Sequence, residues 1–165
     1  MIKTGRPVMP DGYGVPENDE TLLPWDYVDS RMAKARNYWI ITVSPNGAPA
    51  ATPVWGVWFD DKLYFDGAPS TRRGRNIMSN PRTLVHLESG DEVVILEGQT
   101  VILQGAPERS LAERVASEYT QKYASQGYSP TPDQWDQGGL FIFTPTKAIG
   151  WSKFPEDVTR WKLGG

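Results

Sequence analysis

Cysteine is absent from this chain, and histidine occurs only once, as His86. Without cysteine the chain forms no disulfide framework, no thiolate nucleophile and no cysteine-based metal site. A single histidine excludes metal sites that need several imidazoles, and its position within an apolar run favours a structural role over a catalytic one. The sequence therefore predicts no metal site, and it identifies no catalytic side chain.

Two common nucleotide-binding patterns, GxGxxG and GxxxxGK followed by Ser or Thr, are missing as well. No segment reaches the length of a membrane span, and the first residues lack the apolar core of a signal peptide. We therefore expect a cytoplasmic protein with no membrane partner. The formal net charge of −3 argues against a nucleic-acid partner, because general nucleic-acid binding usually needs a basic face.

Acidic residues are absent from one stretch in particular, residues 67–87. The same stretch holds four arginines, Arg72, Arg73, Arg75 and Arg82. A basic segment within an otherwise acidic protein favours a small anionic ligand over a long polyanion. The alternative is that these arginines form the solvated face of a surface helix, and their spacing alone does not separate the two interpretations.

The residues around these arginines predict a short helix whose N-terminus suits an anion. Gly67-Ala68-Pro69 interrupts the preceding strand, Ser70-Thr71 stands at the N-cap position, and the helix ends at Asn80-Pro81. Backbone N–H groups, hydroxyls and guanidinium groups would converge there, which is typical of a phosphate site. The cap and the apolar hairpin before it favour a binding site over a solvated helix.

Apolar runs and turn residues predict a chain built mainly of strands. Pro45-Asn46-Gly47 is a strong hairpin signal, and Glu97-Gly98 marks a bulge or corner in a long strand. Helices are expected over residues 26–36 and 107–124, besides the short basic helix. We expect strands over residues 38–43, 50–59, 63–65, 83–87, 92–104, 140–143, 148–151 and 157–163, with Pro145 dividing the 140–143 and 148–151 strands.

Hairpin connections between most of these strands predict a mainly β (α+β) protein, a closed or nearly closed antiparallel barrel with a few flanking helices. A doubly wound parallel sheet would need alternating strands and helices, which the first half of the chain lacks. Residues 1–24 are interrupted by proline and glycine and predict an extended arm, which would either fray or lie over a partner subunit. Residues 25–165 form a single predicted domain.

Four short motifs follow one another in a distinctive order: Tyr38-Trp39-Ile40, the TPVWGVW run of residues 52–58, Thr71-Arg72-Arg73 and Thr159-Arg160-Trp161. Their order resembles that in the pyridoxamine 5'-phosphate oxidase-like split β-barrel flavoproteins. Within that superfamily the likeness is greatest to the branch that uses the deazaflavin coenzyme F420. The likeness covers residues 25–162, and each motif is loose, whereas their order and spacing together are fairly specific.

This resemblance implies an antiparallel split β-barrel that forms a homodimer and holds two flavin-like cofactors, FMN or coenzyme F420, at the subunit interface. The ring would lie against residues 52–55, and the phosphate would lie at residues 71–73 with Asn76 nearby. That placement agrees with the anion site derived from charge and capping. The implied cofactor-binding residues are Thr52, Pro53, Val54, Trp55, Gly67, Ser70, Thr71, Arg72, Arg73 and Asn76.

Departures from the family pattern bear on the substrate. The true pyridoxamine 5'-phosphate oxidases place Arg and Lys at the two ends of the second strand, where this chain has Ala51 and Gly56. This difference argues against pyridoxamine 5'-phosphate as the substrate. The position of Arg73 is usually Lys in relatives, and arginine keeps the charge while adding a bidentate fork.

The activity that the resemblance implies is an oxidoreductase that transfers a hydride between reduced F420 or FMN and a small unsaturated organic substrate. The cofactor carries such chemistry, so few catalytic side chains are needed. A different class of function is a non-catalytic protein that holds a flavin or a haem as a carrier or sensor. A third is a structural barrel whose anion site is empty or binds a phosphate-bearing metabolite.

Tryptophans and one glycine are further candidates near the ring. Gly56 places no side chain on the Thr52–Val54 face, so a flat ring could approach the backbone there, and Gly56→Leu is expected to block the ring while leaving the fold intact. Pro53 predicts an interruption or an edge in this strand. The candidate pocket walls are Trp55, Trp58, Trp151 and Trp161, although core or dimer packing is the commoner role of any one tryptophan.

Overall fold

The computed structural model describes residues 1–164, and within them antiparallel strands dominate. The strands are β1 (Ile2–Gly5), β2 (Tyr38–Val43), β3 (Pro49–Val54), β4 (Val57–Phe59), β5 (Lys62–Asp66), β6 (Arg82–His86), β7 (Val93–Ile102), β8 (Leu140–Trp151) and β9 (Thr159–Leu163). The α-helices are α1 (Asp26–Lys34), α2 (Arg72–Ser79) and α3 (Arg109–Tyr123). Short 3₁₀ turns, η1 (Ala124–Gln126) and η2 (Pro132–Trp135), follow α3.

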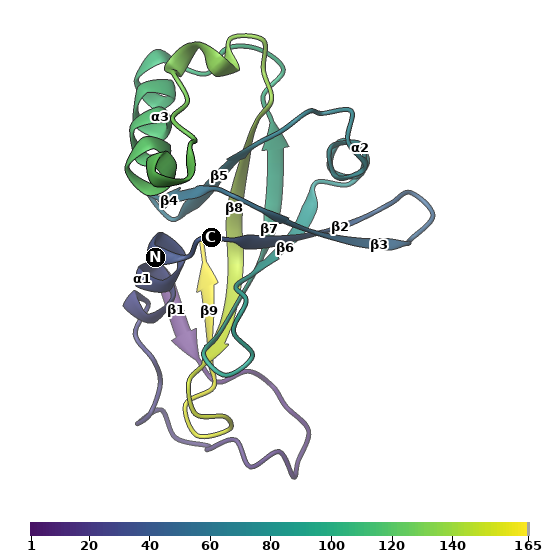
Figure 1. Ribbon diagram of the computed structural model, residues 1–165. Coiled ribbons are helices and arrows are strands. Elements are labelled where there is room, and N and C mark those ends of the chain that lie inside the picture. Colours follow the sequence, from purple (N-terminus) through teal and green to yellow (C-terminus); the bar gives the residue numbers. More distant parts are fainter. Residues whose placement is uncertain (165) are drawn as a thin grey trace.

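Every strand pair in this sheet is antiparallel, and the order of the strands is β1-β9-β8-β7-β6-β2-β3. The small hairpin of β4 and β5 joins the sheet through β5, which pairs with β8. Figure 1 shows the β2–β3 hairpin projecting away from the rest of the sheet. The predicted class, a mainly β antiparallel fold with a few flanking helices, is confirmed.

Two predicted strand boundaries were wrong, for reasons that involve proline and glycine. The predicted strand 50–59 is divided into β3 and β4 at Trp55-Gly56, and β3 lies at the edge of the sheet, where Pro53 loses no ladder bond. By contrast, β8 continues through Pro145, which pairs with Gly98 where the β7–β8 register shifts and Thr146 of β8 is the extra, unpaired residue. The predicted bulge at residues 97–98 is confirmed, and there the register shift accommodates the missing N–H of proline.

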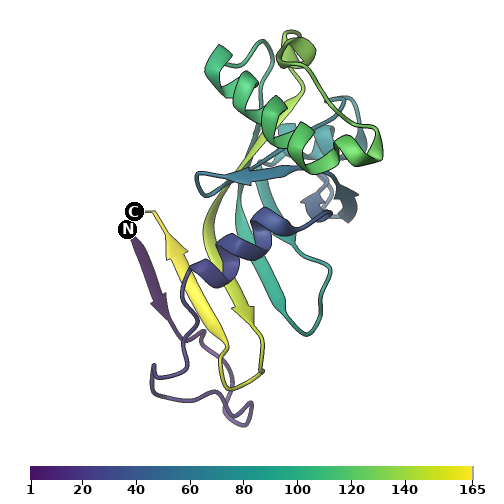
Figure 2. The ribbon, with the colours of Figure 1, turned by 60° about the vertical axis from the view of Figure 1, so that its left-hand side comes forward.

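One face of the sheet is covered by α1, as Figure 2 shows. Tyr27, Val28 and Met32 of this helix are buried against the inward side chains of β2, β6, β7 and β8, together with Trp161. Burial of this apolar surface is the main stabilising contribution to the fold. A second buried cluster forms where α3 packs over β4 and β5, and it includes Val115.

The opposite side chains of the same strands point to the other face of the sheet, which we call the outer face. Successive residues of a strand alternate between faces, so the buried Ile40 is flanked by half-buried residues on the outer face. Cross-strand pairing places these residues in adjacent positions across β2, β6, β7 and β8. The outer face is formed by Trp39, Ile41, Leu84, His86, Ile95 and Ile149, all half-buried.

The N-terminal arm begins with β1, which pairs with β9 as the last strand of the sheet. This strand was not predicted, because its four residues lack an apolar pattern. Arg6 then donates hydrogen bonds to the carbonyl oxygens of Asn18, Glu156 and Val158 and to Thr21 Oγ1, at 2.8–3.1 Å. The arm is thus held to the loop before β9 at its base.

Two negative findings concern residues 1–164. None of their helices is both long enough and apolar enough to span a membrane. Within the same residues, no three His, Asp or Glu side chains are grouped in a way that suits a metal ion.

Candidate functional site

The start of α2 has the capped geometry that the sequence predicts. Thr71 is the N-cap residue, and its Oγ1 accepts a hydrogen bond from the Gly74 N–H at 3.1 Å. The backbone N–H groups of Arg72 and Arg73 precede the first intrahelical bond and have no acceptor within residues 1–164. Two free donors at the positive end of a helix favour an anion.

Arg73 adds a guanidinium group that is held in an apolar setting. It lies over the rings of Phe65 and Phe141, 5.7 and 5.6 Å from their centroids, and its Nε is buried without a hydrogen-bond partner in the described part of the chain. Burial lowers the pKa of Arg73, while Asp66 and Tyr119 raise it by a smaller amount. A bound anion would offset this cost of burying the charge.

Glycines allow the close packing around this arginine. Gly67 has φ +155°, and a Cβ on it would lie 2.8 Å from Arg73 Nη2, so a side chain there would displace the guanidinium. Gly74 brings the first turn of α2 against Pro69, because a Cβ there would lie 2.1 Å from the Pro69 carbonyl oxygen. The sequence analysis missed Gly74, although a glycine within a basic helix is a signal of close approach.

A buried hydrogen bond fixes the far side of α2. Asn76 is buried, and its Nδ2 donates to Thr42 Oγ1 of β2 at 3.0 Å. This bond joins the helix to the hairpin that carries Thr52. Ser70 and Arg72 are exposed, and Ser70 accepts a hydrogen bond from Arg75 through its carbonyl oxygen.

The predicted strand residues lie in two different surroundings. Thr52, Pro53 and Val54 belong to the edge strand β3, whereas Trp55 leaves the sheet and stacks on Tyr123 of α3, with ring centroids 4.8 Å apart. No hydrogen bond within residues 1–164 joins residues 52–55 to residues 67–76. Within one chain the residues at the start of α2 therefore lie together, whereas β3 is linked to α2 through its partner strand β2.

The expectation that Gly56→Leu leaves the fold intact was wrong. Gly56 is buried, and a Cβ there would lie 2.9 Å from the Tyr64 carbonyl oxygen of β5. Its N–H donates to Tyr123 Oη, and its carbonyl oxygen accepts from Tyr123 Oη and Lys122 Nζ at 2.9 and 3.0 Å. This glycine is needed for backbone packing at the break between β3 and β4, and a larger residue would disturb that packing.

The four candidate tryptophans divide between core and surface. Trp161 is fully buried beneath α1, and Trp58 is buried with its Nε1 donating to Asp29. These two serve the core, as the commoner role predicts. Trp151 is half-buried at the end of β8, and it is the candidate that stands beside an open cavity.

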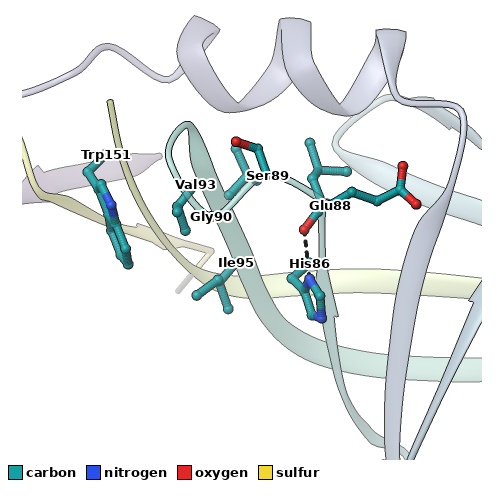
Figure 3. Close-up of a pocket in the computed structure, with 9 residues that line it drawn as sticks. His86, Glu88, Ser89, Gly90, Val93, Ile95 and Trp151 are labelled. Atoms are coloured by element: carbon teal, nitrogen blue, oxygen red, sulfur yellow. Dashed lines mark hydrogen bonds between the residues drawn. The ribbon is translucent and has the colours of Figure 1, made fainter. Parts of the chain in front are cut away.

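That cavity lies beside the outer face and has a volume of about 370 Å³. Among its lining residues are His86, Val93, Ile95 and Trp151 (Figure 3). His86 stacks on Trp39, with centroids 6.2 Å apart and planes 4° apart. The lining is mainly apolar, which suits a flat organic ligand.

The hydrogen bond of His86 assigns its two ring nitrogens. Nδ1 lies 2.7 Å from the Leu87 carbonyl oxygen (Figure 3), and because a carbonyl oxygen only accepts, Nδ1 carries the proton. In this tautomer the ring has its lone pair on Nε2. The sequence prediction of a structural role agrees with this bond and with the Trp39 stack. It did not anticipate a cavity here, because the walls come from three strands and the turn of residues 87–90.

Residues 26–151 match the family model described as pyridoxamine 5'-phosphate oxidase. No curated protein matches the chain. The family match covers α1, the start of α2 and the strands that form the outer face, so both features described above lie within it.

Solved structures share the fold at low sequence identity. A conserved hypothetical protein from Mycobacterium tuberculosis is 18% identical with a TM-score of 0.66, covering 83% of this chain and 89% of that one. A structure named F420 reductase is 19% identical with a TM-score of 0.55, covering 85% and 98%. HutZ of Vibrio cholerae, named as a haem storage protein, is 15% identical with a TM-score of 0.54, covering 70% and 85%.

Proposed function

This chain belongs to the pyridoxamine 5'-phosphate oxidase family, and we propose that it is an oxidoreductase that uses FMN or coenzyme F420. It transfers a hydride between the reduced cofactor and a small unsaturated organic substrate. The family includes flavin and deazaflavin enzymes, and one similar structure is named F420 reductase. The cofactor supplies the hydride chemistry when bound, and the residues of this chain bind it, orient it and exclude water.

The observation that carries this proposal is the unpaired guanidinium of Arg73 at the start of α2. Its buried Nε has no hydrogen-bond partner, and Arg73 forms none of the ion pairs found in residues 1–164. The adjacent free N–H groups of Arg72 and Arg73 add two donors. A phosphate would accept hydrogen bonds from all of these groups, which fits the phosphate of FMN or F420.

The outer face supports a homodimer as the working form. It presents half-buried apolar side chains over four adjacent strands, and the projecting β2–β3 hairpin exposes Pro49, Ala51 and Pro53 (Figure 1). Large contiguous apolar surfaces of this kind mark association sites. A second copy of the chain would cover this face, and an isologous two-fold interface is the commonest arrangement.

A homodimer would also complete the cofactor site. The start of α2 offers donors for a phosphate but little flat apolar surface, whereas the cavity beside Trp151 and Ile95 offers a flat apolar surface and lacks arginine and lysine. In our proposal the phosphate binds to α2 of one copy, and the cavity of the other copy covers the ring. Each dimer then holds two equivalent sites.

The absorbance spectrum of the purified protein, followed by titration with FMN and with F420, tests this function. The two cofactors absorb differently, so binding and identity emerge together. We expect saturable binding of one cofactor per chain, followed by turnover with an unsaturated acceptor. A protein that binds neither cofactor would contradict the proposal, and one that binds without turnover would favour a carrier or sensor.

A second candidate function, a haem carrier, is favoured by the geometry of His86. Its Nε2 has no hydrogen-bond partner among residues 1–164, its Nδ1 is fixed by the Leu87 carbonyl oxygen, and mainly apolar walls adjoin it. A hydrogen bond of this kind orients histidines that ligate metals. Haemin titration would produce a Soret band that the His86→Ala variant lacks if this candidate holds, and an unchanged spectrum in that variant would exclude His86 as the ligand.

A further inference from the structure

Three aromatic side chains form a continuous row that leads from the cavity to the N-terminal arm. Phe154 contacts Trp151 edge-on, with ring centroids 5.5 Å apart, and Tyr13 contacts Phe154 at 6.4 Å with perpendicular planes. We call Tyr13, Phe154 and Trp151 the aromatic row. Trp151 also lines the cavity, so the row extends its apolar wall beyond the sheet.

Tyr13 and Phe154, the outer two members of the row, are largely exposed to solvent. Tyr13 is 55% exposed and Phe154 is 43% exposed, so they contribute little to the core. Exposed aromatic side chains beside a cavity are typical of surfaces that bind ligands.

The backbone that carries these rings is well anchored. The Asp157 carboxylate accepts hydrogen bonds from the backbone N–H groups of Ser152 and Lys153 at 2.8–3.1 Å, which fixes the turn that presents Phe154. Arg6 bonds to the carbonyl oxygens of Asn18 and Glu156, so it joins the base of the arm to the base of this turn. These bonds hold the backbone on either side of the row, and Tyr13 and Phe154 lie side by side. The two rings therefore lose little conformational entropy when a ligand binds.

The charges around the row restrict the ligand. Residues 11–20 contain four acidic side chains and no lysine or arginine, and all four acids are exposed. Glu88 lines the cavity and Glu156 follows Phe154, whereas the nearby basic residues are Lys153 and Arg6, so acidic side chains are in excess around the row. An anionic ligand would be repelled by this segment, whereas an uncharged or cationic one would not. The anion site at Arg73 is assigned to the cofactor, so the substrate needs no negative charge of its own.

We propose that the aromatic row is the substrate-recognition wall of this enzyme, and that its substrate is a flat, conjugated molecule without negative charge. The substrate would stack on Trp151 beside the cofactor ring, and Phe154 would contact its edge, because the planes of these two rings lie 61° apart. Tyr13 would extend the same wall outward. This inference rests on the proposed function for the reaction, but the binding of a flat molecule to the row is measurable without any cofactor.

Isothermal titration of the full chain with menadione, an uncharged bicyclic quinone, tests the proposal. Its matched control ligand is 1,4-naphthoquinone-2-sulfonate, which has the same rings and a negative charge. We expect menadione to bind, with the sulfonate at least about tenfold weaker. We expect Phe154→Ala to weaken menadione binding roughly three- to tenfold and Tyr13→Ala to weaken it by less, the usual scale for one aromatic contact.

The matched control variant is Val8→Ala, which alters an exposed apolar residue of the same arm outside the row. Its menadione affinity should equal that of the parent. In the cofactor-loaded enzyme, Phe154→Ala should raise KM for an uncharged quinone with little change in kcat. Absent menadione binding, equal binding of the sulfonate, or an unchanged affinity in Phe154→Ala would each overturn the proposal, and none of these results would affect cofactor binding at Arg73.

Discussion

The start of α2 and the cavity beside Trp151 differ in charge, in burial and in the ligand that each suits. At α2 a half-buried guanidinium and two free N–H groups are grouped on a short capped helix. At the cavity, mainly apolar side chains of β6, β7 and β8 surround an open space with no lysine or arginine, and the turn of residues 87–90 adds Glu88 and Ser89. Each region lacks what the other supplies, which is why we propose that two copies of the chain combine them.

The largest effect is expected from loss of the dimer, because it would separate α2 of one copy from the cavity of the other. Ile41 lies on the outer face, where Ile41→Asp would bury an unpaired carboxylate in the proposed interface. We expect this variant to sediment as a monomer at micromolar concentration and to bind FMN or F420 about 100-fold or more weakly, because several kcal/mol of interface energy is lost.

Val8→Asp is the matched control for that variant, because it adds the same charge at an exposed position of the arm. It should remain a dimer with unchanged cofactor affinity. A parent chain that sediments as a monomer and still binds cofactor would contradict the proposed assembly, whatever the variants do.

The next largest effect is the loss of phosphate binding at α2, which leaves the cavity unchanged. Arg73→Ala should weaken FMN binding by about 1.5–3 kcal/mol, the usual scale for a hydrogen bond to a charged group. Riboflavin has the same ring without the phosphate, so its affinity should not change. Titration of both ligands therefore measures the phosphate contribution directly. Equal losses for FMN and riboflavin would show that Arg73 acts on the fold or on the ring.

Most of the α2 region could be predicted from the sequence because its signals are local. A Ser-Thr cap, a run of arginines and a terminating Asn-Pro lie within twelve residues, and the structure confirms the cap at Thr71. The support from Thr42 could not be predicted, because its bond to Asn76 joins residues 34 positions apart. Tertiary contacts of that kind leave no local pattern.

The cavity illustrates the opposite case. Its walls come from β6, β7, β8 and the turn of residues 87–90, and only the strand register places His86 beside Ile95 and Val93 beside Trp151. The role of Gly56 was misjudged for a related reason, because alternation along one strand does not reveal that β5 lies against it. The division at Pro145 was wrong because β8 accommodates that proline with a bulge at Thr146 and stays paired with β7 on both sides of it.

A smaller expected effect concerns Lys122, whose hydrogen bonds lie outside both binding regions. Lys122 is half-buried, its Nζ donates to Tyr38 Oη at 2.6 Å and to the Gly56 carbonyl oxygen, and burial lowers its pKa from 10.5 to about 8. The folded chain thus releases this proton at lower pH than the unfolded chain does. Between pH 8 and 10 the unfolded state binds more protons, so the free energy of unfolding rises with pH, by about 2 kcal/mol.

Denaturant unfolding at pH 7, 8, 9 and 10 checks this effect, with Lys122→Met as the comparison. The rise should be present in the parent and absent in the variant, while cofactor affinity at pH 7 changes little. Above pH 10 the trend should reverse, because burial raises the pKa of Tyr38 and raises that of Tyr123 to about 12. A parent curve with the same slope as the variant would show that Lys122 is not desolvated.

The central claim, that each cofactor site combines α2 of one copy with the cavity of the other, is tested most directly by complementation between two variants. Arg73→Ala and Trp151→Ala homodimers each have two damaged sites. A heterodimer of the two, purified through different tags, would have one intact site and one site with both defects. The account predicts that the heterodimer binds one FMN or F420 per dimer with the affinity of the parent. A heterodimer with no site of parental affinity would contradict it, because both halves would then belong to one chain.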